Sequence, residues 1–224
     1  MEFLSKLNLA TRIVEPEILD SLPADDPAAL ANRRDLRLYN RLMGSYGWFG
    51  RTLQRVSQIT HVTEYGPGDG SLAMRLLRNG IINTETTYVG VDLIGQPNGW
   101  PYRWHRQDIR TFVPDASSHL LVANLILHQF SEPELKQVGQ RIQDSPLQYV
   151  ITNEPSRKRH HLWQVSLSRL FGIHPVTYHD AQVSIRAGFR RDELASLLGL
   201  DESDWSINWS ETFMGCNRLL CIRK

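Results

Sequence analysis

The stretch Glu64-Tyr65-Gly66-Pro67-Gly68-Asp69-Gly70 decides the fold of this 224-residue chain. A short apolar run, residues 61–63, precedes it, and leucines at helical spacing follow it, so the segment predicts strand, turn and helix in succession. Glycine permits positive φ and leaves backbone amides open to polar ligand atoms. The spacing of the glycines fits neither the dinucleotide-binding fingerprint nor the phosphate loop, which ends in Gly-Lys-Ser/Thr.

Three further motifs follow the glycine turn. Residues 88–93 have the pattern of a buried strand and end near Asp92, where nucleotide-binding α/β units place a carboxylate on ribose hydroxyls. Asp108 follows a third strand pattern, and the apolar run 120–130 predicts a fourth strand with a loop after it. A lone glycine triplet would be weak evidence, whereas four motifs in this order over about seventy residues are strong evidence.

Together these motifs resemble those of class I S-adenosylmethionine-dependent methyltransferases. The resemblance implies that the chain binds S-adenosylmethionine (SAM) as its cofactor. Glu64 would orient the ammonium of the methionine part, Asp92 would hold the ribose, and Asp108 would meet the adenine. The residues that the resemblance assigns to SAM are Glu64, Gly66, Gly68, Gly70, Asp92, Leu93, Asp108, Ile109 and Asn124. Asp92 as a simple strand-end acid and Asp108 as an ordinary loop acid are the alternatives.

The order of the patterns predicts an α/β fold, with a Rossmann-like seven-strand methyltransferase sheet, helices on both faces and the last strand antiparallel. An N-terminal helical appendage precedes it. We expect a lead-in and cap helices in residues 1–58 and the core in 59–224, with a substrate-side insertion at about 154–190. After the first strand, we expect strands at 87–91, 102–106, 148–153, 205–210 and 216–222, and one that begins at residue 119. We expect helices at 48–57, 132–142, 162–171 and 191–198, one that begins at residue 27 and stops before 44, and one that follows the glycine turn and ends at 78.

The segment between Leu93 and Pro101 is too rich in glycine and proline for a crossover helix. Members of the family usually carry a helix there, so this sequence departs from the family by a loop. Leu93, Ile94 or Trp100 is then expected to cover the purine.

Composition limits the possible partners. The chain is 41% apolar, which suffices for one full core, and its 25 basic and 24 acidic residues leave a net charge of +1. No overall field favours nucleic acid or an acidic membrane, so we expect a small-molecule partner. No signal-peptide core and no membrane span is evident, which predicts a cytoplasmic protein of open oligomeric state. Cys216 and Cys221 have odd spacing in one strand pattern, which argues against a disulfide, and no metal site is expected.

The acceptor side is predicted from a weaker pattern. Residues 174–189 resemble a segment of a small-molecule branch of the superfamily found with quinone and polyketide biosynthesis. That resemblance implies acceptor contacts in this segment and in the N-terminal helices. The residues so assigned are Tyr39, Asp180, Ser184 and Arg186. A structural turn with an ion pair between Asp180 and Arg186 is the alternative.

Two histidines are candidate catalytic residues. His128 lies after the fourth strand pattern, near the expected methyl group, and either contacts the substrate or caps the loop. His179 is the candidate general base, although adjacent side chains such as His179 and Asp180 seldom hydrogen-bond each other directly. A phenol would need such a base at neutral pH because its pKa is near 10. His161 is expected at the surface.

The sequence therefore predicts methyl transfer from SAM to a small aromatic, quinone-like or polyketide-like acceptor. One alternative is a non-catalytic protein that binds SAM or its demethylated product in a structural or regulatory role. Another is a nicotinamide dehydrogenase, which the glycine spacing opposes. The sequence does not distinguish O-, C- and N-methylation.

Overall fold

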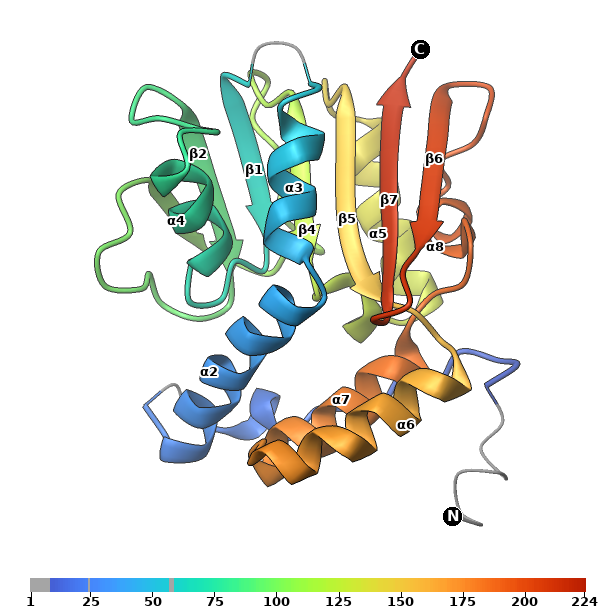
Figure 1. The fold of residues 1–224 in the computed structure, drawn as a ribbon. Helices are drawn as coiled ribbons and strands as arrows, with labels where there is room; N and C mark the ends of the chain where they lie inside the picture. The colour runs from blue at the N-terminus through green and yellow to red at the C-terminus, as the bar shows by residue number, and fades with distance from the viewer. Residues whose placement is uncertain (1–8, 24, 57–58) are drawn as a thin grey trace.

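A computed structural model describes residues 9–23, 25–56 and 59–224 of the chain. Within these residues seven strands form one sheet in the order β3-β2-β1-β4-β5-β7-β6 (Figure 1). The first five strands pair in parallel, and β7 is antiparallel to both β5 and β6. The predicted fold is confirmed. The strands are β1 His61–Tyr65, β2 Thr87–Asp92, β3 Arg103–Arg106, β4 Leu120–Asn124, β5 Tyr149–Pro155, β6 Trp205–Glu211 and β7 Cys216–Arg223.

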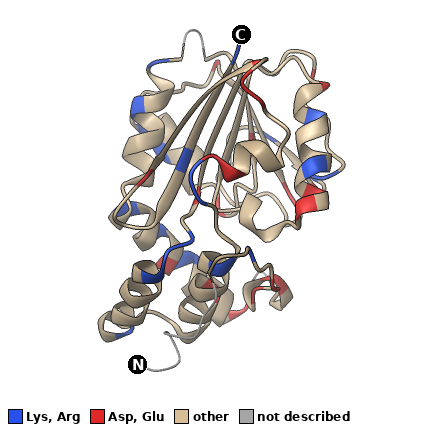
Figure 2. Cartoon of the chain, turned by 90° about the vertical axis from the view of Figure 1, so that its right-hand side faces the viewer, with Lys and Arg blue, Asp and Glu red and all other residues tan. Residues whose placement is uncertain are grey.

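Helices cover both faces of this sheet (Figure 2). Successive strand side chains point to opposite faces, so β1, β2, β4, β5 and β7 each contribute to two hydrophobic clusters. On one face α3 (Ser45–Leu53) and α4 (Ser71–Arg78) pack with Val62 and Val122. On the other face α5 (Glu132–Gln143) and α8 (Glu193–Leu197) pack with Leu121. The core is thus divided between the two faces of one sheet.

A third group of helices lies across the carboxyl ends of the parallel strands (Figure 1). It consists of α2 (Pro27–Leu42), α6 (Arg159–Ser168) and α7 (Pro175–Ala187), and α7 packs against both others. Proline in the first turn and a capping side chain start two of these helices. Asp26 accepts from the amide of Ala28 at 2.7 Å in α2, and His174 accepts from Val176 at 3.3 Å in α7. Residues 175–187, which the sequence suggested as a polar pocket segment or turn, are therefore a regular helix.

Several element boundaries differ from the predicted ones. Helix α6 begins at Arg159 and is followed by the 3-10 turn η3 (Arg169–Phe171), whereas one helix over 162–171 was expected. Strand β5 continues two residues past 153 to Pro155, which brings Glu154 to the sheet edge. Helix α3 spans Ser45–Leu53, whereas a helix over 48–57 was expected; residue 57 itself lies outside the described residues.

The loop between β2 and β3 has no helix in its described residues 93–102, as predicted. Trp100 fills the space in its place. The residue is 5% exposed, and its ring packs edge-on against Tyr88 and Trp104, with centroid separations of 5.8 and 5.3 Å. One consequence is that Trp100 belongs to the core rather than to the purine site.

The N-terminal segment from residue 9 docks on the rest of the chain, as expected for a lead-in. The amide of Ile13 donates to the carbonyl of Arg186 at 3.2 Å, and a 3-10 turn, η1 (Leu19–Ser21), precedes α2. Among the described residues, no helix combines the length and apolar character required to cross a bilayer. Both cysteines are free and buried.

Candidate functional site

A cavity of about 890 Å³ lies between the carboxyl ends of the parallel strands and the group of helices α2, α6 and α7. Open α/β sheets bind ligands at this edge. Eight of the nine residues predicted to bind the cofactor line the cavity, namely Glu64, Gly66, Gly68, Asp92, Leu93, Asp108, Ile109 and Asn124. The ninth, Gly70, is not among the lining residues.

The three glycines of the turn are needed for different reasons. All three have positive φ, at 63°, 57° and 74° for Gly66, Gly68 and Gly70. A Cβ on Gly66 would lie 2.6 Å from Ile126, and one on Gly70 would lie 2.7 Å from Trp100, so these two serve close packing. A Cβ on Gly68 would meet no atom within 4 Å. Gly68 alone therefore has a left-handed backbone and open space toward the cavity, and the structure does not support cofactor contact by Gly70.

Two buried acids flank the turn. The hydroxyl of Tyr88 donates to Oε2 of Glu64 at 2.8 Å, and burial raises the pKa of Glu64 to about 8. Oδ2 of Asp92 accepts from the amide of Gly68 at 2.9 Å, and its Oδ1 accepts from Ile94 at 3.2 Å. Burial also raises the pKa of Asp92. Asp92 therefore fixes the glycine turn as well as lining the cavity.

Asp108 forms the next part of the wall. The guanidinium of Arg110 binds both of its carboxylate oxygens and also pairs with Glu134. Hydrogen bonds from Arg110 hold the pKa of Asp108 below its usual value, so Asp108 is ionised. Leu93 is 64% exposed and lines the cavity beside Ile94. Of the three residues expected to cover a purine, these two therefore line the cavity and Trp100 does not.

Asn124 ends β4 and joins three elements. Its Nδ2 donates to Oδ1 of Asn40 in α2 at 3.0 Å, and its Oδ1 accepts from Asn153 in β5 at 2.9 Å. The next residue, Leu125, lines the cavity with a φ of 58°, which is costly for a side chain other than glycine. The edge between β4 and β5 is thus held in a specific, strained shape.

His128 lies buried between two carboxylates. Its Nδ1 lies 2.8 Å from Glu154 and its Nε2 lies 3.3 Å from Glu17. Burial alone would lower the pKa of His128, but hydrogen bonds to Glu154 and Glu17 outweigh it and raise the pKa to about 9. His128 is therefore protonated at neutral pH. A cation fixed in this way cannot accept a proton, so the predicted catalytic role of His128 does not extend to general-base chemistry.

Asp180 anchors the N-terminal segment. It is 4% exposed and accepts from the amides of Ile18 and Leu19 at 2.8 and 3.1 Å, and from Asn32 at 3.3 Å. His179 also reaches it, with Nδ1 3.0 Å from Oδ1, contrary to the expectation for adjacent side chains. All of these contacts are internal to the fold.

Three of the residues predicted on the acceptor side lie outside the cavity lining: His179, Asp180 and Arg186. Arg186 pairs instead with Glu15 at 2.5 Å, and Asp180 accepts from the amides of Ile18 and Leu19, so the suggested ion pair between Asp180 and Arg186 is not formed. The side chain of His179 is 49% exposed. The predicted acceptor contacts of these residues and the base role of His179 have no geometric support, whereas Tyr39 and Ser184 do line the cavity.

His161 in α6 lines the cavity, contrary to its expected surface position. The residue is 2% exposed, and its Nδ1 lies 2.9 Å from Oε1 of Gln164. A carbonyl oxygen can only accept, so we assign the Nδ1–H tautomer, which leaves a lone pair on Nε2. That Nε2 is buried without a hydrogen-bond partner among the described residues. Burial lowers the pKa of His161, so the ring is neutral at pH 7.

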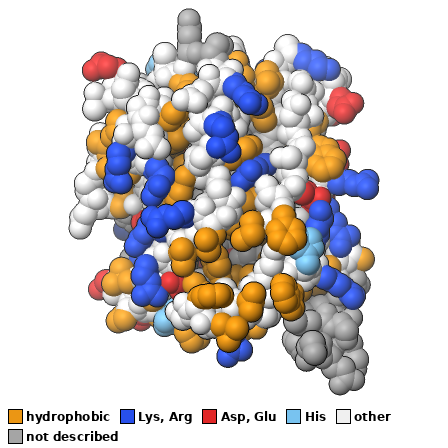
Figure 3. Space-filling view, in the orientation of Figure 1, with side chains coloured by type: hydrophobic (Ala, Val, Ile, Leu, Met, Phe, Trp, Pro, Cys, Tyr) orange, Lys and Arg blue, Asp and Glu red, His pale blue; other side chains and the backbone are white. Residues whose placement is uncertain are grey.

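The helical side of the cavity is mainly apolar. Figure 3 shows hydrophobic side chains gathered around a hollow in the helical half of the molecule. Phe171 and Phe213 are each 77% exposed, and Trp163 is 61% exposed, although isolated side chains of this size are usually buried. The apolar lining residues on this side include Leu19, Leu22, Leu36, Leu42, Met43, Trp163, Val165, Leu167, Phe171, Ile185, Phe213 and Met214.

Glu17 and Glu154 line or adjoin the cavity without having been predicted as site residues, and His161 was expected at the surface. Glu154 has a usable signal, because it follows Asn153 at the end of a strand whose neighbour ends at Asn124. Glu17 and His161 have none, since irregular chain and a helix bring them to the cavity from distant parts of the sequence. Among the described residues no three His, Cys, Asp or Glu side chains are grouped to hold a metal ion.

No protein-family model matches the sequence, and no curated protein matches it. Many solved structures match the fold. The plantazolicin methyltransferase BamL, solved with a triazolic desmethylPZN analog and SAH, aligns with a TM-score of 0.69 at 11% identity over 92% of each chain. TnmH aligns with a TM-score of 0.60 at 16% identity, covering 93% of this chain and 62% of its own.

The pyocyanin biosynthetic protein PhzM aligns with a TM-score of 0.54 at 15% identity over 79% of this chain. This chain spans about half of that protein, 54% of its length, and almost the whole of BamL. At such low identities the similarity concerns the fold. The chain has the fold of methyltransferases that have been solved with SAH.

Proposed function

We propose that the chain transfers the methyl group of SAM to a small, largely apolar acceptor. One observation carries this proposal: a single cavity joins the acid-lined edge of a methyltransferase sheet to an apolar wall of helices. At about 890 Å³ it lies at the upper end of the range for ligand pockets, about 300 to 1,000 Å³. The cavity is therefore large enough for two ligands side by side.

The residues of the sheet edge fit SAM. The open space above Gly68 admits a ligand against its backbone, while Glu64 is a buried acid whose raised pKa a bound ammonium would lower. Asp92 offers the acceptor oxygens that ribose hydroxyls need, and Asp108 and Leu93 lie farther along the same wall. SAH, present in the solved relatives, is the demethylated product of SAM, which agrees with this assignment.

When bound, SAM supplies an electrophilic methyl group on a sulfonium. The nucleophile forms a bond to that carbon while the electron pair of the carbon–sulfur bond stays on sulfur, and an O–H or N–H acceptor loses a proton. The chain's part is to hold the reactants in line and exclude water, which can supply about 7 to 11 kcal/mol at best. Glu64 and Asp92 fix one reactant, and the apolar helices enclose the other.

We assign the general base to His161 for acceptors that must lose a proton. The residue lines the apolar side of the cavity, its ring is neutral at pH 7, and Gln164 fixes the tautomer that leaves Nε2 able to accept. An unpaired buried nitrogen is costly unless a ligand or water satisfies it. An acceptor hydroxyl that reached this buried nitrogen would satisfy it.

The apolar wall favours a planar aromatic or conjugated acceptor, in the class of phenols, quinols and polyketides. Trp163, Phe171 and Phe213 offer ring surfaces at the opening. A highly charged acceptor would lose its hydration against this wall without compensation.

Calorimetric titration of the full chain with SAM, SAH and, separately, NAD tests the cofactor. We expect binding of the first two and none of NAD. A methyl-transfer screen with SAM over phenols, quinols, thiols and amines, read by mass, then tests the reaction. SAM binding without transfer to any class would favour the non-catalytic alternative, and absence of SAM binding would overturn the proposal.

A further inference from the structure

A second cavity, of about 410 Å³, lies between α2 and α4, outside the cavity of about 890 Å³ that we call the cofactor cavity. Five of its nine lining residues are arginines, and none is acidic. Figure 3 shows basic side chains over these two helices. We call this cavity the arginine pocket; it is lined by Arg34, Arg37, Leu38, Arg41, Tyr46, Ser71, Met74, Arg75 and Arg78.

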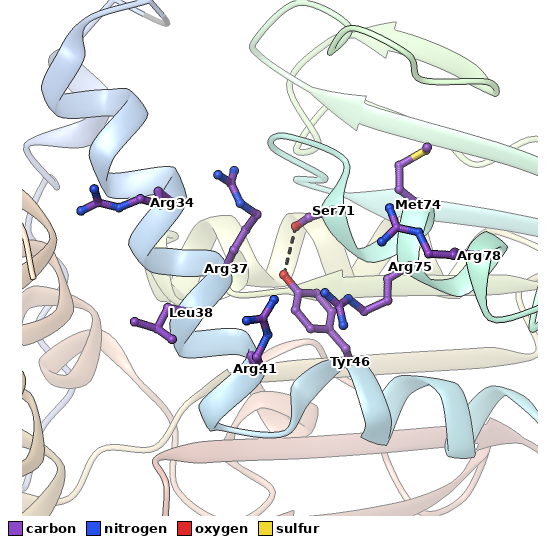
Figure 4. Close-up of a pocket in the computed structure, with 9 residues that line it drawn as sticks. All are labelled: Arg34, Arg37, Leu38, Arg41, Tyr46, Ser71, Met74, Arg75 and Arg78. Carbon is purple, nitrogen blue, oxygen red and sulfur yellow. Dashed lines mark hydrogen bonds between the residues drawn. The ribbon is translucent and has the colours of Figure 1, made fainter.

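The helical repeat places these cations opposite one another. Residues 34, 37 and 41 recur on one face of α2, and residues 75 and 78 recur on one face of α4. In Figure 4 Arg41 and Arg75 lie on either side of Tyr46, whereas Arg34 points away from the pocket. The guanidinium groups of Arg37, Arg41, Arg75 and Arg78 therefore lie inside the pocket or at its rim.

The floor of the pocket is a fixed polar pair. The hydroxyl of Tyr46 lies 3.1 Å from that of Ser71, and the guanidinium of Arg75 stacks 4.6 Å from the Tyr46 ring centroid (Figure 4). Burial raises the pKa of Tyr46, so its hydroxyl keeps its proton at neutral pH. The stacked Arg75 has a defined orientation, which reduces the entropy lost when it binds an anion.

Internal carboxylates compensate these cations only in part. Arg37 pairs with Asp69, while Arg34 pairs with Asp35 outside the pocket. Arg41 and Arg78 form no ion pair with a carboxylate of the described residues, and both are exposed. Facing guanidinium groups repel one another, and a shared anion converts that repulsion into paired hydrogen bonds. In a chain of net charge +1 this concentration of positive charge is local.

The arginine pocket adjoins the cofactor cavity, because Arg37 and Ser71 line both. We propose that the arginine pocket binds a phosphate or diphosphate group, carried either by the methyl acceptor or by a separate small molecule. Guanidinium groups fit phosphate oxygens through paired N–H donors, and several together suit a group with more than one negative charge. Only the question of which molecule carries the phosphate depends on the proposed methyl transfer.

Calorimetry with pyrophosphate at low salt tests the site on the full chain. Arg41→Gln combined with Arg78→Gln should weaken pyrophosphate binding by about tenfold or more, because two charge-assisted contacts are lost. Arg51→Gln combined with Arg55→Gln is the matched control, since both side chains are exposed outside the pocket and the charge change is the same. No binding by the parent chain at millimolar pyrophosphate, or equal weakening in both double variants, would overturn the proposal.

SAM affinity should stay unchanged in both double variants, since none of the four arginines lines the cofactor cavity. This measurement separates failure of the phosphate site from failure of the proposed methyl transfer. With an acceptor identified, competition between pyrophosphate and acceptor, with a raised KM and unchanged kcat in the pocket variant, assigns the phosphate to the acceptor. A pyrophosphate effect on rate without competition assigns it to a separate molecule. Either result supports the site.

Discussion

The two walls of the large cavity are held in place in different ways. On the sheet wall, Asp92 ends β2 and Gly68 lies in the turn that follows β1, and the β1–β2 ladder brings them together. On the helical wall, Asp180 in α7 binds the amides of Ile18 and Leu19, which are about 160 residues away in sequence and share no ladder with it. The helical wall is therefore held by hydrogen bonds to a side-chain carboxylate, whereas the sheet wall is held by backbone hydrogen bonds between strands.

Because of this difference, we expect the two walls to respond differently to substitution. A ladder contains many hydrogen bonds, so one substitution at a strand end changes the contacts with a ligand more than it changes the position of the strand. A buried carboxylate is a single anchor, and its loss leaves backbone amides unpaired, at about 1 to 3 kcal/mol each. We therefore expect sheet-wall variants to lose SAM and helical-wall variants to lose stability or acceptor chemistry.

The largest effect is expected at Asp92. Asp92→Ala should weaken SAM binding by at least about a hundredfold, because two hydrogen bonds to a charged acceptor are lost, each worth about 1.5 to 3 kcal/mol. Calorimetry measures the change in affinity, and circular dichroism checks the fold. Asp115→Ala, at an exposed acid away from the cavity, is the control. Unchanged SAM affinity would remove Asp92 from the site.

His161 tests whether the helical wall contributes chemistry as well as enclosure. For a phenolic acceptor, His161→Gln should lower kcat by about 10² to 10⁴ fold while SAM affinity stays constant. The parent rate should rise with pH until His161 loses its proton, below its usual pKa, and level off near neutrality. The deficit of the variant should shrink at high pH as the phenol ionises unaided. A small deficit at pH 7 would assign His161 to packing.

The sheet wall could be predicted from the sequence better than the helical wall. The seven-strand sheet with its antiparallel last strand and the missing crossover helix could be predicted, and eight of the nine residues expected to bind a cofactor line the large cavity, because each depends on local patterns and on strand ends that meet at one edge. Asp180 was expected either at the acceptor or in an ion pair with Arg186, whereas its observed partners include the backbone amides of Ile18 and Leu19 in an irregular segment. No periodicity encodes such a contact. Gly70, the ninth of these residues, lies outside the cavity lining, and its need for a small residue comes from Trp100.

His128 should make stability depend on pH. Its folded-state pKa of about 9 exceeds the unfolded value near 6.5, so its contribution is complete below 6.5 and is lost as pH rises to about 9. The loss is on the order of 3 kcal/mol at about 1.4 kcal/mol per pH unit. Denaturant titrations of the parent chain and His128→Gln from pH 6 to 10 measure it. Glu64, with its raised pKa, lowers stability between pH 4.5 and 8 in both proteins, so the difference between them isolates His128. Parallel curves would contradict the carboxylate-bound cation.

A smaller effect is expected at Gly68, for which the chain supplies a matched control. Gly68 and Gly80 have φ of 57° and 65°, and a Cβ on either would meet nothing within 4 Å. Alanine at each should cost about 1 kcal/mol of stability through backbone strain. Only Gly68→Ala adds a methyl group to the cavity, so it alone should weaken SAM binding, roughly tenfold. Equal affinities in the two variants would make the glycine turn a structural feature only.

The smallest effect is expected at His179. The side chain is half exposed, lies outside the cavity lining and contacts Asp180, whose other contacts come from Ile18, Leu19 and Asn32. One hydrogen bond contributes about 0.5 to 1.5 kcal/mol, so His179→Gln should change kcat by less than about twofold and stability only slightly. Asp180→Asn, one residue along, should instead lower the melting temperature and expose the segment that contains Glu17 to proteolysis, because the anchor loses its charge and one acceptor oxygen. A large loss of kcat in His179→Gln with a normal melting temperature would mean that α7 carries the base, and it would move the chemistry from His161 to the side of the helical wall that the sequence pattern first indicated.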